Sequence, residues 1–480
     1  HRLSIVYLYW KNRNNKPQPK ARFQELPVVT VQLPMFNEKF VVDRLLESVA
    51  ALDYPQDKLE IQILDDSTDD TTEQCYRKVE ELKSRGFDAV CIHRTDRTGF
   101  KAGALEAATK VAKGEFLLIL DADFVPEPDL LQKTIHFFTD ENVGLVQTRW
   151  GHINREYNLL TRIQGMYLDG HFAMEQTARN RSGRFFTFNG TAGIWRKCVI
   201  GDAGGWSHDT LTEDMDLSYR VQLRGWRFIY LNDVVTPAEL PVDMDGFKSQ
   251  QHRWTKGSIQ VCQKILLDIW RSNAPLKAKV EATTHLTCNY SYLLLALLCF
   301  LVYPICTQRI PENETVFMWF VNVALFFMTS VAVCIFYMSA QIVVRPKSWW
   351  KELPYLPLLL TLSVGMAVNN AKAVLEAIFG HQSAFVRTPK YGVDRKEDRR
   401  HVSQLKRNGY RAIKSVVIPV LEIACGTFFL NLIIIMIRQG HYLSPILMIP
   451  FLGFYYTGFC SLGRMISNLL PAKQTAKAKN

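Results

Sequence analysis

The sequence lacks any pair of cysteines at the C-x-x-C spacing that structural zinc sites use. Its ten cysteines are scattered over 480 residues, and several fall inside apolar stretches. This distribution predicts reduced, buried thiols, and it argues against a disulfide framework or a structural zinc ion.

The sequence also lacks the mixture of basic and aromatic residues that is typical of nucleic-acid-binding surfaces. Its formal net charge is +11, but the lysines and arginines collect in loops beside apolar runs. This pattern indicates attraction to an anionic membrane surface, and we expect no nucleic acid partner.

Long apolar runs are missing before about residue 285. Four runs of membrane-spanning length follow, at residues 283–303, 316–340, 416–437 and 443–461. Near the start, residues 3–10 are apolar but too short to span, and no signal-peptide cleavage site follows them. We therefore expect residues 1–26 to hold the end of a transmembrane helix and a linker, and residues 283–480 to form a transmembrane region.

A fifth apolar stretch, residues 353–379, lies between two loops that are both rich in Lys and Arg, residues 345–351 and 381–414. Basic loops favour the cytoplasmic side of a membrane, so this stretch should begin and end on one side. It also contains prolines and charged residues, which predicts a broken helix on the inner leaflet. Residues 241–282 show apolar residues at helical spacing with lysines between them, which predicts further amphipathic interfacial helices.

Residues 27–240 alternate apolar, β-branched stretches with amphipathic ones. Strands are expected at residues 28–33, 59–64, 90–93, 116–126, 143–148 and 225–230, with helices such as 39–51 and 71–85 between them. This alternation predicts a parallel α/β sheet, in which ligands lie at the carboxyl ends of the strands.

The central stretch 116–126 carries two carboxylates one residue apart, Asp121 and Asp123. In a strand they would point to the same side and could hold a divalent cation. Carboxylate oxygens suit Mg²⁺ or Mn²⁺, which complete their shells with water and substrate phosphates. The alternative is that Asp-Ala-Asp only ends a strand and opens a turn, since two prolines follow.

Two neighbouring segments should lie on the same edge of the sheet. Asp65 and Asp66 follow the second expected strand. Arg97 and Lys101 precede or open a glycine-containing helix start, which favours phosphate binding. Together these segments predict an anion and metal site at one edge of the sheet.

Three other motifs are open to more than one interpretation. Asn189 and Gly190 lie in an aromatic stretch where the backbone could come close to a ligand. Glu213 and Asp214 follow Thr212 at a helix start, where capping by Thr212 is one explanation and a general base is the other. Trp254, considered alone, favours an interfacial membrane anchor.

Taken together, these motifs resemble those of the processive inverting glycosyltransferases of the cellulose synthase and hyaluronan synthase group. The motifs that carry the resemblance are Asp65-Asp66, Asp121-Ala-Asp123, Thr212-Glu213-Asp214 and Gln250-x-x-Arg253-Trp254. Residues 385–390 look like the gating loop of that group, which we place at residues 381–392. Residues 147–150, 188–193 and 204–206 are most similar to cellulose-synthase-like proteins that make mannan or xyloglucan backbones.

The resemblance implies a GT-A-like (Rossmann-like) cytoplasmic domain joined to a helical transmembrane channel, and it assigns roles to residues. Asp65 and Asp66 would bind the nucleotide, Arg97 and Lys101 the phosphates, and Asp121 and Asp123 the metal. Asp214 would be the base, with Glu213 beside it; Gln250, Arg253, Trp254, Asn189, Gly190, Thr388 and Lys390 would contact substrate.

The function implied is transfer of a hexose from a nucleotide sugar to a growing β-linked polysaccharide, with passage of the polymer across an inner or plasma membrane. The donor would be a UDP-sugar or GDP-mannose, and the group's commonest donor favours the UDP-sugar. The alternative is a non-processive glycosyltransferase that acts on a lipid acceptor, since such enzymes share the aspartates and the Gln-x-x-Arg-Trp motif.

Overall fold

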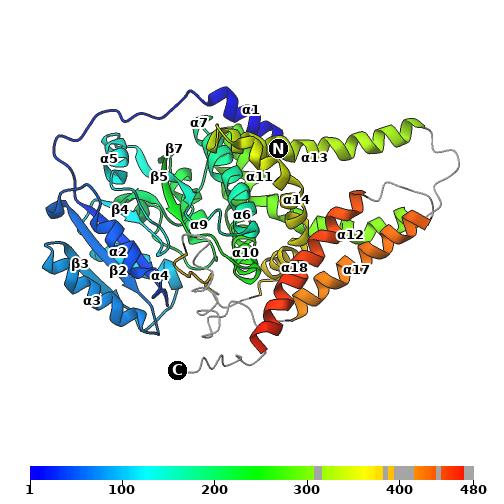
Figure 1. Cartoon of the computed structure of the whole chain (residues 1–480). Helices are drawn as coiled ribbons and strands as arrows, with labels where there is room; N and C mark the ends of the chain where they lie inside the picture. Colours follow the sequence, from blue (N-terminus) through cyan, green and yellow to red (C-terminus); the bar gives the residue numbers. More distant parts are fainter. Residues whose placement is uncertain (308–315, 382–386, 394–415, 439–444, 470–480) are drawn as a thin grey trace, which may run out of the picture.

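The computed structural model describes residues 1–307, 316–381, 387–393, 416–438 and 445–469, and it shows an α/β domain with an arm of helices beside it (Figure 1). The α/β domain holds the first part of the chain, and the arm holds α12, α13, α17 and α18. This division agrees with the change from mixed to apolar sequence near residue 285.

A seven-stranded sheet forms the centre of the α/β domain, in the order β3-β2-β1-β4-β6-β5-β7. The strands are β1 Val29–Met35, β2 Leu59–Asp65, β3 Asp88–His93, β4 Phe116–Ile119, β5 Val143–His152, β6 Gly193–Arg196 and β7 Arg227–Ala238. β1 pairs in parallel with β2 and β4, and β2 with β3, but β6 runs antiparallel to β4 and β5. The expected all-parallel sheet is therefore wrong, because the chain returns from the ligand edge through β6.

The central strand is also shorter than expected. β4 ends at Ile119, and the backbone N–H of Phe124 donates to the Asp121 carbonyl oxygen at 3.0 Å, which closes a turn. The Asp121 N–H donates to the Thr191 hydroxyl at 2.8 Å. Asp121 and Asp123 are thus placed by a turn after the strand, and the alternation rule for strands does not apply to them.

Helices and short helical turns connect the strands. They are η1 Gln56–Lys58, α2 Val42–Ala50, α3 Thr71–Ser84, α4 Phe100–Val111, α5 Leu130–Thr134, η2 Ile135–Thr139, α6 Leu159–Asp169, α7 Thr177–Arg181, α8 Lys197–Asp202 and α9 Glu213–Leu223. A π-helical segment, η3 Gly170–Gln176, joins α6 to α7 without a break. Such segments are rare and frequently lie at functional sites.

The amphipathic segment after the sheet forms α10 Met244–Arg271 and α11 Leu276–Thr287, as the helical spacing predicts. Part of its apolar face is covered by protein, whereas Leu267, Trp270 and Leu276 are exposed. Val261, Ile265 and Ile269 pack against Tyr219 of α9 and against α11, and Ile259 packs against α15 Ala367–Ile378. The segment is helical as expected, and its interfacial placement stays a prediction.

The chain after α11 begins with η4 Cys288–Tyr290. It continues with α12 Ser291–Thr307, α13 Val316–Val344, η5 Trp349–Tyr355, α14 Leu356–Gly365, α15, α17 Val417–Arg438 and α18 Pro445–Leu469, and α1 Arg2–Asn12 packs against α13. Among the described residues, α17 alone is long and apolar enough to cross a membrane, and two bent helix pairs would qualify if each were one span. The other expected spans, 316–340 and 443–461, lie partly outside the described side chains.

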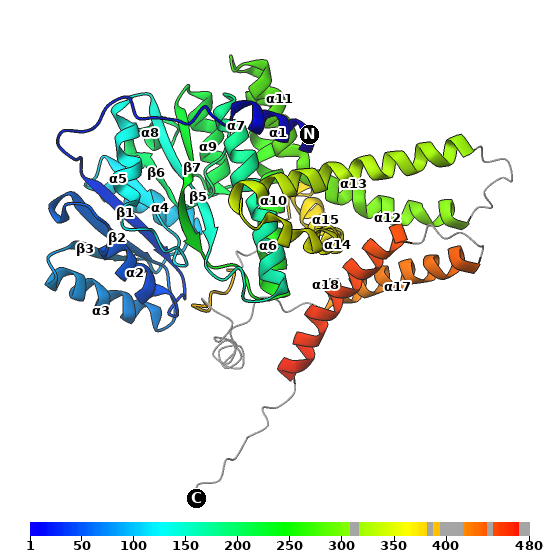
Figure 2. The same cartoon turned by 45° about the horizontal axis from the view of Figure 1, so that its top comes forward.

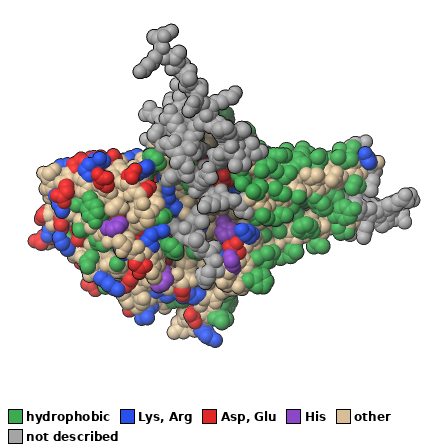
Figure 3. Space-filling view, turned by 90° about the horizontal axis from the view of Figure 1, so that it is seen from below, with side chains coloured by type: hydrophobic (Ala, Val, Ile, Leu, Met, Phe, Trp, Pro, Cys, Tyr) green, Lys and Arg blue, Asp and Glu red, His purple; other side chains and the backbone are tan. Residues whose placement is uncertain are grey.

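The stretch 353–379 is broken, as predicted. Two helical segments, residues 349–365 and 367–378, meet at an angle of 40°. Exposed apolar side chains also gather on the arm, including Leu294, Phe300 and Val417, and Figure 3 shows this apolar surface beside the mixed surface of the α/β domain.

A buried ion pair connects the two parts of the molecule. The Lys248 ammonium of α10 donates to the Glu422 carboxylate of α17 at 2.5 Å and to the Thr457 carbonyl oxygen of α18 at 3.1 Å. Both charged side chains are almost completely buried. Loss of either partner would leave a buried charge unpaired, at a cost of about 3–5 kcal/mol.

The cysteines of the described residues are free thiols. Cys75, Cys262 and Cys299 are buried as expected, but Cys198, Cys288 and Cys460 are exposed. The expectation of buried thiols is thus wrong for these last residues, because position in an apolar run does not fix which side of a helix faces outward.

Candidate active site

A cavity of about 190 Å³ opens at the carboxyl ends of β1, β2 and β4. The site residues predicted from the sequence line this cavity, with Asp65 the exception. The lining comes from the sheet, from α4, α9 and α10, and from residues 387–390. Segments far apart in the sequence therefore meet at the edge of the sheet where the alternation of strands and helices places ligands.

Two lysines neutralise the central aspartates. Lys101, in the first turn of α4, forms an ion pair with Asp121 and donates to the Gly190 carbonyl oxygen at 2.8 Å. Lys390 forms an ion pair with Asp123 at 2.5 Å. Burial lowers the pKa of each lysine, but the neighbouring carboxylates outweigh it and raise the pKa above its ordinary value, so both lysines stay charged.

The two aspartates after β2, Asp65 and Asp66, have different surroundings. Asp66 lines the cavity and accepts two hydrogen bonds from the Arg94 guanidinium, at 2.8 and 2.6 Å. Asp65 is fully buried away from the cavity, where it accepts from the Ser67 N–H at 3.0 Å and contacts Thr72 and His93 at 2.7 Å. Asp65 thus holds the loop after β2, and it does not reach the predicted substrate site.

Arg97 lies beside Asp66 and lines the same part of the cavity. Its guanidinium carbon lies 3.4 Å from the centre of the Phe36 ring, so the cation stacks on an aromatic face at the end of β1. This placement keeps a positive charge at the edge of the cavity without a direct ion pair to Asp66.

Asp214 lies in the first turn of α9, where the helix dipole favours a carboxylate. Burial raises the pKa of Asp214 to about 7, and the nearby Glu213 carboxylate adds to the rise. Among the described residues, the Thr212 hydroxyl makes no capping hydrogen bond. The capping interpretation is therefore not supported, and the structure leaves a carboxyl that titrates near neutral pH in the cavity wall.

Gly190 closes the cavity next to Asp214. Its φ is +81°, and a Cβ there would lie 3.1 Å from Asp214 Oδ2 and 3.5 Å from Lys101 Nζ. Glycine is needed for both the backbone conformation and the space, which agrees with the expected close approach of the backbone.

Three predicted residues share one face of α10. Gln250, Arg253 and Trp254 are spaced at i, i+3 and i+4, and all line the cavity. Burial lowers the pKa of Arg253, although Glu213 and Asp121 oppose the effect. Trp254 packs against Leu168, Phe172 and Leu240 in the α/β domain, so the membrane-anchor interpretation is wrong.

Part of the predicted gating loop covers the cavity. Residues 382–386 lie outside the described residues, whereas residues 387–393 are described. Thr388 lines the cavity, and among the described residues its buried hydroxyl has no hydrogen-bond partner. An unsatisfied hydroxyl at this place is available to a ligand.

Glu239, at the end of β7, anchors this segment and was not predicted from the sequence. Its carboxylate accepts from the N–H groups of Tyr391, Gly392 and Val393 at 2.9, 3.0 and 3.1 Å. These bonds fix the backbone that carries Lys390 into the cavity.

Glu38, which follows β1, was not predicted as a site residue from the sequence. It lines the cavity, and burial raises its pKa to about 7, with Asp123 adding to the rise and Arg387, 3.6 Å away, opposing it. The cavity therefore contains two carboxyls that titrate near pH 7, Asp214 and Glu38.

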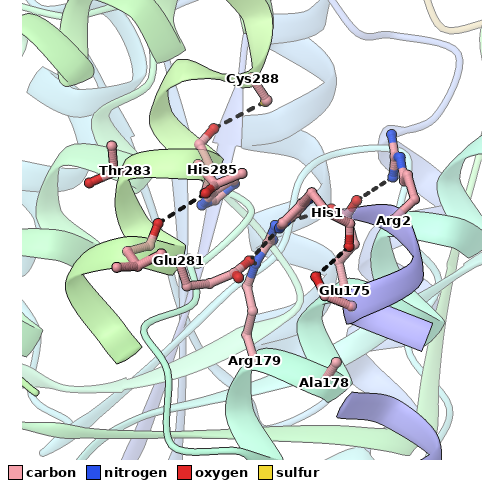
Figure 4. Close-up of polar contacts among 12 residues, drawn as sticks. His1, Arg2, Glu175, Ala178, Arg179, Glu281, Thr283, His285 and Cys288 are labelled. Atoms are coloured by element: carbon pink, nitrogen blue, oxygen red, sulfur yellow. Dashed lines mark hydrogen bonds and ion pairs between the residues drawn. The ribbon is translucent and has the colours of Figure 1, made fainter. Parts of the chain in front are cut away.

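Asn189 also contacts a network of charged and polar side chains on the side away from the cavity. Asn189 contacts the His171 ring at 3.1 Å and accepts from Gln176 at 2.6 Å, both in the π-helical segment. His171 contacts Glu175 at 3.0 Å, and Arg179 bridges Glu175 and Glu281 (Figure 4). The i, i+4 spacing of His171, Glu175 and Arg179 is a local pattern, but their contacts with Asn189 and Glu281 arise only in the fold.

Asp121 and Asp123 fit a divalent ion that arrives with a substrate. The described residues contain no group of three or more His, Cys, Asp or Glu side chains that could hold a metal alone. Two carboxylates that face one cavity are nevertheless enough for Mg²⁺ or Mn²⁺ when substrate phosphates supply the other ligands.

The mixed sheet, with a carboxylate and lysine cavity at its edge, is the arrangement of a GT-A-like glycosyltransferase. The sequence profile described as glycosyltransferase like family 2 matches residues 27–257, and the cellulose synthase profile matches residues 193–440. The chain belongs to the cellulose synthase family.

Curated relatives carry more specific names. Glucomannan 4-beta-mannosyltransferase 2 from Arabidopsis thaliana is 42% identical over 284 residues, which cover 56% of this chain and 52% of the relative. Glucomannan 4-beta-mannosyltransferase 1 from Oryza sativa subsp. japonica is 40% identical over 277 residues, 57% of this chain and 53% of the relative. The matches thus span about half the length of these relatives.

A solved structure shares the fold. The mannosyltransferase PcManGT from Pyrobaculum calidifontis, in complex with GDP-Man and Mn²⁺, superposes with a TM-score of 0.55 at 20% identity. The match covers 79% of this chain and 96% of that protein.

Proposed function

We propose that the chain transfers mannose from GDP-mannose to the end of a growing β-linked polysaccharide. The observation that carries the proposal is Asp214, a carboxyl with a pKa near 7 in the wall of a cavity that also holds Lys101 and Asp121. The names of the curated relatives support mannose as the sugar. They replace the initial preference for a UDP-sugar, which rested only on the commonest donor of the group.

Asp214 acts as the general base. An in-line displacement needs one carboxylate to take the proton of the acceptor hydroxyl as that oxygen attacks the anomeric carbon, while the nucleoside diphosphate leaves. This displacement inverts the anomeric centre. A pKa near the working pH suits the task, because the carboxyl is then both deprotonated and basic enough.

The opposite side of the cavity binds the leaving diphosphate. Asp121 and Asp123 would hold the divalent ion, which when bound supplies positive charge to the diphosphate. Lys101 and Lys390 now neutralise those aspartates, and the same ammonium groups can turn to phosphate oxygens. The Thr388 hydroxyl and Arg97 add a donor and a charge on this side.

The α10 face receives the acceptor. Trp254 offers a ring on which a sugar can stack, and Gln250 and Arg253 lie beside it with hydrogen-bond donors. The helical arm next to α10 would carry the polymer across a membrane, since a polar chain cannot cross lipid without a protein-lined path. The α/β domain would then be cytoplasmic.

The test is donor turnover by the purified full chain in detergent with Mg²⁺ or Mn²⁺. Release of GDP from GDP-mannose, faster than release of UDP from UDP-glucose, together with a labelled polymer on gel filtration, supports the proposal. Transfer of a single sugar to a lipid would show that the enzyme is not processive and would support the alternative, a glycosyltransferase that makes glycolipids. Absence of turnover with either donor would overturn the proposed activity.

A further inference from the structure

A second cavity, of about 400 Å³, lies outside the active site between α1, α7, β5, β7 and the end of α13. α1 packs against α7 and α13 at this place, where the α/β domain meets the apolar arm (Figure 2). Four basic side chains line the cavity: Arg13, Lys16, Arg149 and Arg181.

Most of this positive charge is not balanced by protein. Lys16 forms an ion pair with Asp233 at 2.8 Å. Among the described residues, no carboxylate lies within ion-pair distance of Arg13, Arg149 or Arg181. Guanidinium groups gathered around one cavity make its potential positive, which favours the binding of an anion.

The guanidinium groups are held in place by backbone contacts. Arg149 donates to the Asn232 carbonyl oxygen at 2.8 Å, and Arg181 donates to the Arg13 carbonyl oxygen at 2.5 Å. The Arg181 Nε is buried without a hydrogen-bond partner among the described residues. Burial lowers the pKa of Arg181, and the nearby Tyr9 and Asp233 oppose this effect without cancelling it.

Asn232 gives a second, independent sign of a ligand. It is only 7% exposed and lines the cavity, yet its side-chain oxygen has no donor among the described residues. A buried acceptor of this kind ordinarily has a partner. A ligand that brings both negative charge and a hydroxyl group would satisfy the arginines and Asn232 together.

We propose that this cavity binds a phosphate-bearing anion that also carries a hydroxyl group. Guanidinium groups recognise phosphate through paired, charge-assisted hydrogen bonds, which favours phosphate over a single carboxylate. Two sources share this chemistry: the headgroup of an acidic phospholipid, and a soluble phosphate. The inference is independent of the mannosyl transfer proposed above.

The experiment uses the full chain in detergent and two probes. Native mass spectrometry counts retained phosphatidylglycerol against phosphatidylcholine, and calorimetry measures the affinity for inorganic phosphate. Arg13→Gln and Arg181→Gln should each weaken binding of one probe by about tenfold, the loss expected for one charge-assisted contact. The Arg13 side chain is exposed, so its replacement should not disturb folding.

Lys83→Gln is the matched control, because it removes one exposed positive charge from α3, at the opposite edge of the sheet. It should bind both probes as the unmodified chain does. If Arg13→Gln and Arg181→Gln weaken the binding of phosphatidylglycerol alone, the ligand is a lipid headgroup. If they weaken the binding of inorganic phosphate alone, the ligand is a soluble anion. Equal binding of both probes by all variants, or equal loss in Lys83→Gln, would overturn the proposed site.

Discussion

Aspartate side chains lie on two sides of the candidate active-site cavity, and their surroundings differ between the two sides. On the side that we propose binds the diphosphate, Asp66, Asp121 and Asp123 each contact a cation: Arg94, Lys101 or Lys390. On the side that we propose binds the acceptor, the Asp214 carboxylate accepts a hydrogen bond from the Met215 N–H at 2.8 Å and, among the described residues, forms no ion pair. Ion pairing keeps a carboxylate charged for binding, whereas burial without a partner gives one that can accept a proton.

The largest effect is expected from Asp214→Asn. The substitution keeps the size of the side chain but removes the base, so the transfer rate should fall by about 10³-fold. Nucleotide binding, measured by calorimetry with GDP, should stay within about twofold because the diphosphate side is unchanged. A variant that retains turnover would remove Asp214 from this role.

The next effect is expected from Asp123→Asn on the other side of the cavity. The change removes one proposed metal ligand and the partner of Lys390, so turnover should fall by about 100-fold. The concentration of Mn²⁺ needed for half-maximal activity should rise in parallel, and a chelator should abolish activity of the unmodified chain. If metal titrations of the two proteins coincide, Asp123 does not hold the ion.

A smaller effect concerns pH. Because burial raises the pKa of Asp214 to about 7, the carboxyl becomes protonated and inactive as the pH falls below 7. Transfer rates at saturating donor should therefore decrease about tenfold per pH unit on the acid side. Glu38→Gln is the control, since it removes the other carboxyl with a pKa near 7. Disappearance of the acid limb in Glu38→Gln would assign the base to Glu38.

The smallest effect is expected from Gly190→Ala. The new Cβ would lie 3.1 Å from Asp214 Oδ2 at a φ of +81°, so it would push the base and strain the backbone. We expect about tenfold slower transfer and about 1 kcal/mol lower stability in thermal unfolding. Gly201→Ala is the matched control, because no atom lies within 4 Å of its added Cβ. Equal rates for both variants would show that Gly190 does not shape the site.

Much of this cavity could be predicted from short motifs. The positions of Lys101, Asp121 and Asp214 follow from strand ends and helix starts, and that of Trp254 follows from helical spacing; local sequence indicates both well. The turn after β4 was considered only as the alternative to a continuing strand, because Asp121 and Asp123 directly follow an apolar run.

The remaining differences depend on contacts between distant segments. Two adjacent aspartates look alike in sequence, but Asp65 is buried behind the loop while Asp66 faces the cavity. Glu239 acts on residues more than 150 positions later in the chain, at Tyr391 to Val393. No local sequence pattern shows these long-range contacts. The contacts determine which carboxylates are ion-paired and which one is free to accept a proton.

The most direct test of the central claim is the anomeric configuration of the product. Purified full chain is incubated with GDP-mannose and a divalent ion, and the new linkage is determined by NMR spectroscopy. Displacement assisted by Asp214 alone predicts a β-linked product, inverted relative to the donor. An α-linked product would show retention and would contradict the single-base mechanism.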